Sequence, residues 1–186
     1  MTEKEIIERV KKSMGSRRYL HTEGCVDMAE RLARRWDADV SLARRAAYLH
    51  DVAKEMPYES QLKLFEERGI ALGDMQRSPK IIHAFSGAII AKESFGECEE
   101  VCGAIRWHTT AKPGMTLLEK IIWLADLTEE GRNFDGVSEI RELALTDLSK
   151  ALIKGFDTTI GFLVRNGEKI DTNMIEARNS EISASI

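Results

Sequence analysis

Apolar residues recur three and four positions apart along almost the whole chain, a spacing typical of α-helices that bury one face. No segment alternates strictly between apolar and polar residues over a sustained length, so the pattern does not predict β-strands. Pro57, Pro79 and Pro113 each mark a break between helical stretches. We therefore predict an all-α protein.

The pattern predicts ten helices, bounded by glycine, proline or capping residues. We expect them over about residues 2–14, 17–36, 40–50, 58–68, 82–94, 97–107, 116–127, 138–145, 149–165 and 172–180. Thr2 and Glu5 have the spacing of a capping box, and Asp39 is the expected N-cap of the third helix. Because no long linker divides the chain, we expect a single domain over residues 1–186. Its core would span about residues 17–167, with the terminal helices packed on it.

Composition excludes several classes of protein. The net charge of −4 argues against general nucleic-acid binding, which needs a basic surface. The three cysteines lack CxxC spacing and cannot all pair within the chain, which favours reduced thiols in a cytoplasmic protein. The N-terminal segment is charged and amphipathic, unlike a secretory signal, and no apolar run is long enough to cross a membrane.

The candidate chemistry lies in the histidines, each of which sits on or beside an apolar helical stripe. They are His21, His50, His83 and His108. A single histidine on such a face is more often a hydrogen-bonded core residue than a metal ligand. Asp126 has the same placement, however, and a carboxylate in a core needs a cationic partner. The stripe around Asp126 contains no lysine or arginine, so we predict one buried metal site built from five helices.

These residues resemble a known pattern. The order of His21, His50-Asp51 in LHDVAK and Asp126 in IIWLADL resembles the HD superfamily of metal-dependent phosphohydrolases. A closer resemblance, to the bacterial YqeK family, rests on LHDVAKEM, WHTTAKPGMTLLEKIIWLAD, EEGR and IEARN, and extends over about residues 17–179. That family comprises HD-domain hydrolases that split diadenosine tetraphosphate symmetrically into two ADP, and its fold is a helical bundle. The chain departs from it at Ala84-Phe85, where Gly-Pro is common, and at Glu129-Glu130, where many members carry Glu-Pro.

The resemblance implies two metal ions. The first would be bound by His21, His50, Asp51 and Asp126, and the second by His83 and His108, with Asp51 bridging. The family implies iron; a nitrogen and oxygen donor set also suits manganese, and zinc or another divalent ion stays open. Two ions about 3.5–4 Å apart would lower the pKa of a bridging water to near neutrality. Attack of this water on a phosphorus beside the central bridging oxygen would give two equal halves.

Several polar residues are candidate substrate contacts. Lys54 would share the metal-facing side of the third helix if that helix continues, and we assign it and Asp51 to catalysis. The other candidates are Thr109, Thr110 and Lys112 in the turn after His108, Arg132 after the Asp126 helix, and, more weakly, Arg17 and Arg18. A solvated surface is the alternative for the last two. Trp36, Trp107 and Trp123 are expected in the core.

Two alternative functions stay open. The metal ligands alone do not distinguish a dinucleoside-polyphosphate hydrolase from an HD-type nucleotidase or a guanosine-polyphosphate hydrolase. A non-catalytic nucleotide-sensing domain is an alternative of another class, although the complete ligand set argues against it. The partner common to all of these is a nucleotide. The sequence leaves the oligomeric state open, with a homodimer among the alternatives.

Overall fold

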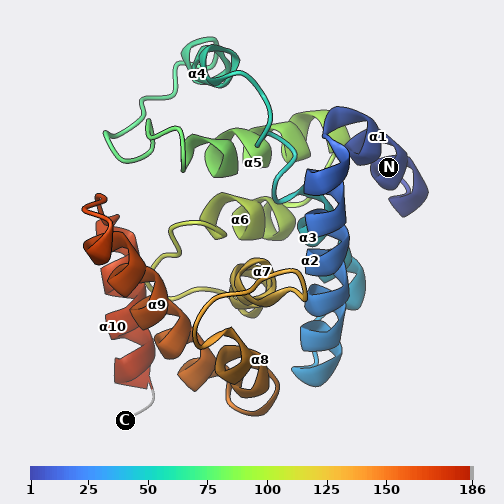
Figure 1. Ribbon diagram of the computed structural model, residues 1–186. Helices are drawn as coiled ribbons and strands as arrows, with labels where there is room; N and C mark the ends of the chain where they lie inside the picture. The colour runs from blue at the N-terminus through green and yellow to red at the C-terminus, as the bar shows by residue number, and fades with distance from the viewer. Residues whose placement is uncertain (185–186) are drawn as a thin grey trace.

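The computed structural model describes residues 1–184 and is built from α-helices joined by loops, the longest of which, over residues 67–81, connects α4 to α5 (Figure 1). The helices are α1 (Glu3–Ser13), α2 (Ser16–Arg35), α3 (Val40–Leu49), α4 (Tyr58–Glu66), α5 (Ile82–Phe95), α6 (Glu99–Trp107), α7 (Leu117–Thr128), α8 (Val137–Thr146), α9 (Leu148–Arg165) and α10 (Thr172–Ala184). Within residues 1–184 there is no β-strand, which confirms the all-α prediction.

The predicted helix ends agree with the structure to within two residues, except that α10 extends four residues beyond the predicted end at 180. The expected capping box of Thr2 and Glu5 is present, and the Asp39 side chain accepts a hydrogen bond from the backbone of Leu42. Helix α6 begins later than predicted. Glu97 lies before it, with its carboxylate turned to the Arg45 guanidinium at 2.7 Å.

One main hydrophobic core includes residues of every helix except α4, and α7 lies near its centre (Figure 1). Both ends of the chain contribute to it, through Ile6 and Val10 of α1 and Met174 of α10. Trp123 is buried in this core, as predicted. Trp36 packs against the same core and Trp107 against a smaller cluster between α4 and α5; both are partly buried.

Helices α7 and α9 approach each other closely at Gly155. A Cβ atom at this position would lie 2.7 Å from Cζ3 of Trp123 and 2.9 Å from Cδ2 of Leu127. Glycine is therefore required there by packing, and the close approach fixes α9 against α7. No helix within residues 1–184 is long and apolar enough to cross a membrane.

Candidate metal centre

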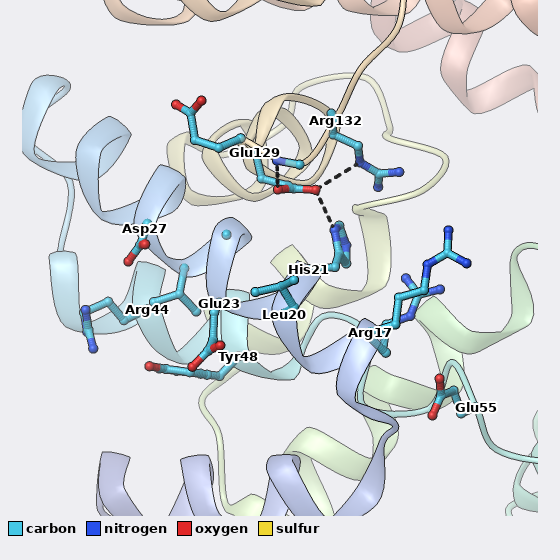
Figure 2. A pocket seen from close by; sticks show the side chains of 15 residues that line it. Arg17, Leu20, His21, Glu23, Asp27, Arg44, Tyr48, Glu55, Glu129 and Arg132 are labelled. Carbon is cyan, nitrogen blue, oxygen red and sulfur yellow. Dashed lines mark hydrogen bonds and ion pairs between the residues drawn. The ribbon is translucent and has the colours of Figure 1, made fainter.

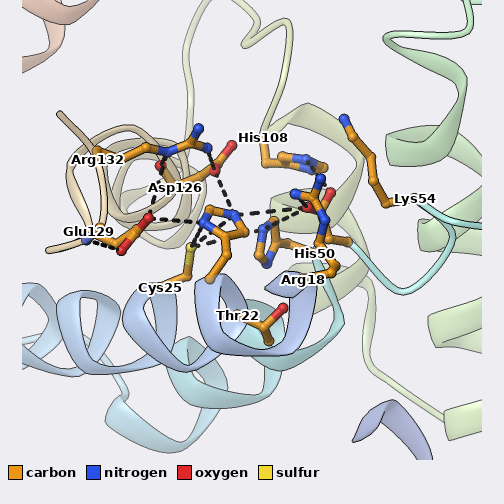
Figure 3. Close-up of polar contacts among 12 residues, drawn as sticks. Arg18, Thr22, Cys25, His50, Lys54, His108, Asp126, Glu129 and Arg132 are labelled. Atoms are coloured by element: carbon orange, nitrogen blue, oxygen red, sulfur yellow. Dashed lines mark hydrogen bonds and ion pairs between the residues drawn. The ribbon is translucent and has the colours of Figure 1, made fainter. Parts of the chain in front are cut away.

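The fold brings all six predicted metal ligands together. Figure 3 labels His50, His108 and Asp126 among the polar contacts of this cluster. The six are His21 on α2, His50 just after α3, Asp51 beside it, His83 on α5, His108 just after α6 and Asp126 on α7. Four of them are almost completely buried, namely His50, Asp51, His83 and His108. The helical stripes therefore indicated the direction of the four histidines and of Asp126 correctly, whereas Asp51 was proposed from the family resemblance.

Asp51 lies between two pairs of histidines. Its Oδ1 atom is 3.3 Å from His83 Nε2 and 3.7 Å from His108 Nε2. Its Oδ2 atom is 3.5 Å from His50 Nε2 and 3.9 Å from His21 Nε2. Each carboxylate oxygen thus faces a different pair of imidazoles, which is the arrangement that a carboxylate shared by two ions requires.

Backbone contacts fix the tautomers of two histidines. His50 Nδ1–H donates to the carbonyl of Ala47 at 2.7 Å, and His108 Nδ1–H donates to the carbonyl of Ile105 at 2.7 Å. Burial lowers the pKa of His50, which keeps this ring neutral. The Nε2 lone pair of His50 therefore points at Asp51, acceptor against acceptor. A cation between them removes this mismatch, and such second contacts are typical of metal-binding histidines.

His21 has two carboxylate neighbours, one of which the sequence analysis missed. Its Nε2 is 3.1 Å from Asp126 Oδ1, and its Nδ1 is 3.1 Å from Oε1 of Glu129, a buried residue. Burial opposes the charged ring, but the contacts with both carboxylates outweigh it and raise the pKa of His21. Glu129 follows Asp126 by three residues. This helical spacing, which puts both carboxylates on one side, is the sequence signal from which Glu129 could have been found.

A glycine on α2 makes room for Glu129. A Cβ atom on Gly24 would lie 2.6 Å from Glu129 Oε2, so α2 and the end of α7 come together here without a side chain between them. The backbone N–H of Gly131 also donates to Glu129 Oε2. Glu129 is thereby held against the Nδ1 side of His21.

The expectation that Asp126 lacks a basic partner is wrong. Arg132 forms an ion pair with the Asp126 carboxylate and donates from Nε to its backbone carbonyl at 2.8 Å. The sequence stripe did not reveal this partner because Arg132 lies beyond the end of α7 and returns through a turn at Gly131. Burial alone would raise the pKa of Asp126, but His21 and Arg132 lower it well below its usual range.

The donor atoms fit metal ions. His21 Nε2 lies 3.1 Å from Asp126 Oδ1, and the Nε2 atoms of His83 and His108 lie 3.2 Å apart. Donors that each sit about 2 Å from one ion have such spacings. The Cys25 thiol is also close, with Sγ 3.5 Å from His21 Nε2, and burial raises its pKa. One donor atom from each of His21, Cys25, His50 and Asp126 lies within 4.8 Å of the others, so the sequence analysis missed a possible sulfur donor.

Lys54 and Arg18 both reach the cluster. Helix α3 ends at Leu49, so the assumption of a continuing helix is wrong; successive turns carry Lys54 to the site instead. Its Nζ lies 3.1 Å from His83 Nε2, and burial lowers its pKa. Arg18 Nη1 donates to Asp51 Oδ2 at 2.7 Å. The alternative prediction, that Arg18 belongs to a solvated surface, is therefore wrong.

The remaining predicted contacts divide into two groups. Thr110 is buried and donates to the carbonyl of Ala111, and Lys112 pairs with Glu119 at 3.1 Å. Neither residue lines a cavity at the cluster. Thr109 does line one, and its hydroxyl is buried.

Two cavities flank the cluster, and Arg132 lines both. The arginine cavity, of about 1070 Å³, is bordered by His21, Arg17 and Arg18 on α2 and by residues 129–132 (Figure 2). The α7–α9 cavity, of about 530 Å³, is lined by His108 and Asp126 together with residues of α7 and α9. Among the described residues, two buried side-chain atoms have no hydrogen-bond partner: Arg18 Nε and Thr109 Oγ1. Arg18 lines the arginine cavity and Thr109 lines the α7–α9 cavity. Buried polar atoms without partners commonly mark the place of a ligand or water.

Comparisons with known proteins agree with this geometry. The HD domain family model matches residues 18–131. A symmetrical bis(5'-nucleosyl)-tetraphosphatase from Bacillus subtilis strain 168 is 37% identical over 186 residues, all of both chains. A protein of the same name from Halalkalibacterium halodurans is 37% identical over 180 residues, which is 96% of each chain.

A solved structure has the same fold. It is the crystal structure of a predicted HD superfamily hydrolase involved in NAD metabolism from Clostridium acetobutylicum. Its TM-score is 0.94 at 41% sequence identity, over 99% of this chain and 98% of that chain. The family match and the cluster of histidines and aspartates together indicate divalent metal binding.

Proposed function

The chain belongs to the HD domain family, and on this premise we propose that it hydrolyses diadenosine tetraphosphate symmetrically into two ADP. The observation that supports the reaction class most strongly is the position of Asp51, whose two oxygens face two separate pairs of histidines. The substrate is supported by the full-length similarity to proteins named symmetrical bis(5'-nucleosyl)-tetraphosphatase.

We further propose the assignment of the metal ligands. His21, His50, Asp51 and Asp126 would hold one ion, while His83 and His108 would hold the other with Asp51 shared. The proposed metal is iron, as the family resemblance implies, and the histidine and carboxylate donors also suit manganese. Bound ions of this kind supply an acidified water and neutralise charge on phosphoryl oxygens.

The protein's own groups would position the substrate. Arg18, Lys54 and Arg132 surround the cluster with positive charge, and a tetraphosphate carries several negative charges. Arg18 also holds Asp51 through Oδ2, so it would orient the shared carboxylate while its unpaired Nε meets a phosphate. Because each cavity is lined by candidate metal ligands and Arg132 lines both, a substrate with a nucleoside at each end could extend into both.

Product analysis tests the proposal. The purified protein, loaded with iron or manganese, is incubated with diadenosine tetraphosphate, and the nucleotides are separated by ion-exchange chromatography. We expect ADP as the single nucleotide product and no turnover by Asp51→Asn. Release of ATP with AMP would show asymmetric cleavage and exclude the symmetrical reaction.

A nucleotide panel tests the alternatives. Faster cleavage of a mononucleotide or of a guanosine polyphosphate than of the dinucleotide would favour the other hydrolase classes. Binding of nucleotide without cleavage of any of them would favour a sensing domain. The single-domain bounds at 1–186, the cytoplasmic location and the homodimer stay predictions.

A further inference from the structure

The α7–α9 cavity differs from the arginine cavity in the side chains that form its walls. Its apolar residues are Trp123 and Leu127 on α7, Phe134 in the following loop and Phe162 on α9. Phe162 is 53% exposed, an unusual state for a large aromatic side chain, whereas Trp123, which lines the same cavity, is buried. An exposed aromatic ring at the wall of a cavity is a surface on which a planar ligand can stack.

The cavity is continuous with the metal centre. His108 and Asp126, which belong to the candidate ligands, form one end of it. Its volume of about 530 Å³ falls within the range of small-molecule sites, roughly 300–1000 Å³. A ligand in this cavity would therefore lie next to the metal centre, so one molecule can occupy both places.

Polar groups border the same space. The hydroxyls of Thr158 and Thr159 line it together with the charged groups of Asp135 and Arg165. These side chains supply hydrogen-bond donors and acceptors of the kind that ribose hydroxyls and the edge of a purine require. Thr109 adds a hydroxyl that has no partner in the part of the chain that the structure describes.

From these observations we propose that the α7–α9 cavity binds the nucleoside of one half of the substrate, with its purine stacked on Phe162. This inference rests on the proposed function, since it assumes a nucleotide whose phosphates lie at the metal centre. The other half would extend past Arg132 into the arginine cavity, where the walls are mostly polar and charged. The two chemically equal halves of the substrate would thus be held by different interactions, stacking on one side and charge on the other.

The test compares two ligands that differ only in the nucleoside. The affinities of ADP and of inorganic pyrophosphate are measured by calorimetry for the metal-loaded wild-type protein and for Phe162→Ala. We expect the substitution to weaken ADP binding about 10-fold, which equals 1.4 kcal/mol and lies within the range for base stacking on an aromatic ring. Pyrophosphate binding should be unchanged, because it does not reach Phe162.

A matched control lies two residues away. Val164 is also on α9 and is 61% exposed, but it lines neither cavity. Val164→Ala should leave the affinities of both ligands unchanged. Since both side chains are largely exposed, neither substitution should prevent folding.

Two results would overturn the proposal: unchanged ADP binding in Phe162→Ala, or equal weakening of ADP and pyrophosphate binding. If unchanged ADP binding is accompanied by a change of oligomeric state in size-exclusion chromatography, Phe162 belongs instead to an interface between copies. Failure of the proposed function is recognised separately. If the wild-type protein does not cleave diadenosine tetraphosphate, the comparison of ADP with pyrophosphate still decides whether this cavity binds a nucleoside.

Discussion

Replacing Gly24 by alanine should weaken metal binding while leaving the fold intact. The new Cβ atom would lie 2.6 Å from Oε2 and 3.3 Å from Cδ of Glu129. Glu129 would have to move, and its carboxylate is the group that contacts His21 Nδ1 at 3.1 Å. His21 would then lose the partner that directs its Nε2 toward Asp126.

The magnitude follows from two opposing contributions. An alanine in a helix interior is by itself more stable than glycine by about 0.5–1 kcal/mol, so helix α2 should not be weakened by the substitution. Loss of a hydrogen-bond partner behind a metal-binding histidine typically reduces metal affinity about 10–100-fold. This corresponds to about 1.4–2.7 kcal/mol. We expect the same range for Glu129→Gln, which keeps the shape but removes the charge.

The assay is a competition for iron or manganese with a chromogenic chelator, and circular dichroism of the metal-free protein checks the fold. Gly161→Ala is the matched control, because it is another helical glycine, and a Cβ atom there meets only the flexible end of Arg165. It should bind metal with wild-type affinity. Wild-type metal affinity in both Gly24→Ala and Glu129→Gln would refute the proposed support of His21 by Glu129.

Three further predictions concern charge and packing. In the metal-free protein, the raised pKa of His21 means that its charged form stabilises the fold below the unfolded-state pKa of about 6.5, and that this contribution is lost as pH rises through the folded-state pKa. An imidazole NMR titration should place His21 above pH 6.5, and a midpoint below that value would contradict the ion pairs. Gly155→Ala should destabilise the protein by about 1–3 kcal/mol, because its Cβ would overlap Trp123. Thermal unfolding should then show a melting temperature lower by roughly 2–4 °C per kcal/mol, and an unchanged value would contradict the close packing. Lys54→Ala should reduce kcat/KM for the tetraphosphate about 10-fold or more with metal content unchanged, whereas an unchanged rate would remove Lys54 from the site.

The sequence predicted the ligand cluster because each ligand has a local signal. His21 precedes apolar residues at helical spacing and Asp126 follows them, so the side of the helix on which each lies can be determined within a few residues. The same spacing predicted helix positions well, since apolar periodicity and capping are local properties. The end of α10 was less accurate because its helix continues through polar residues that carry no such periodicity.

The contacts that the sequence did not predict join residues far apart in the chain. Glu129 lies 108 residues from His21, and Arg18 lies 33 residues from Asp51. Whether two such charged residues meet depends on how α2 packs against the end of α7 and against the turns after α3. No local sequence pattern carries that information. Phe162 was not recognised for a related reason. An apolar residue in a helix is expected to be buried, and only the packed helices reveal that this one lines a cavity.

The ends of α3 and α6 have a consequence for the electrostatics of the cluster. Both helices finish at a candidate ligand, His50 in one and His108 in the other. The carboxyl end of a helix carries partial negative charge from its aligned peptide dipoles and favours a nearby cation by about 0.3–1 kcal/mol. Two such ends directed at one place attract cations through the backbone itself, which no side-chain substitution can remove. Variants that lack a single ligand should therefore keep a weak residual affinity for metal ions.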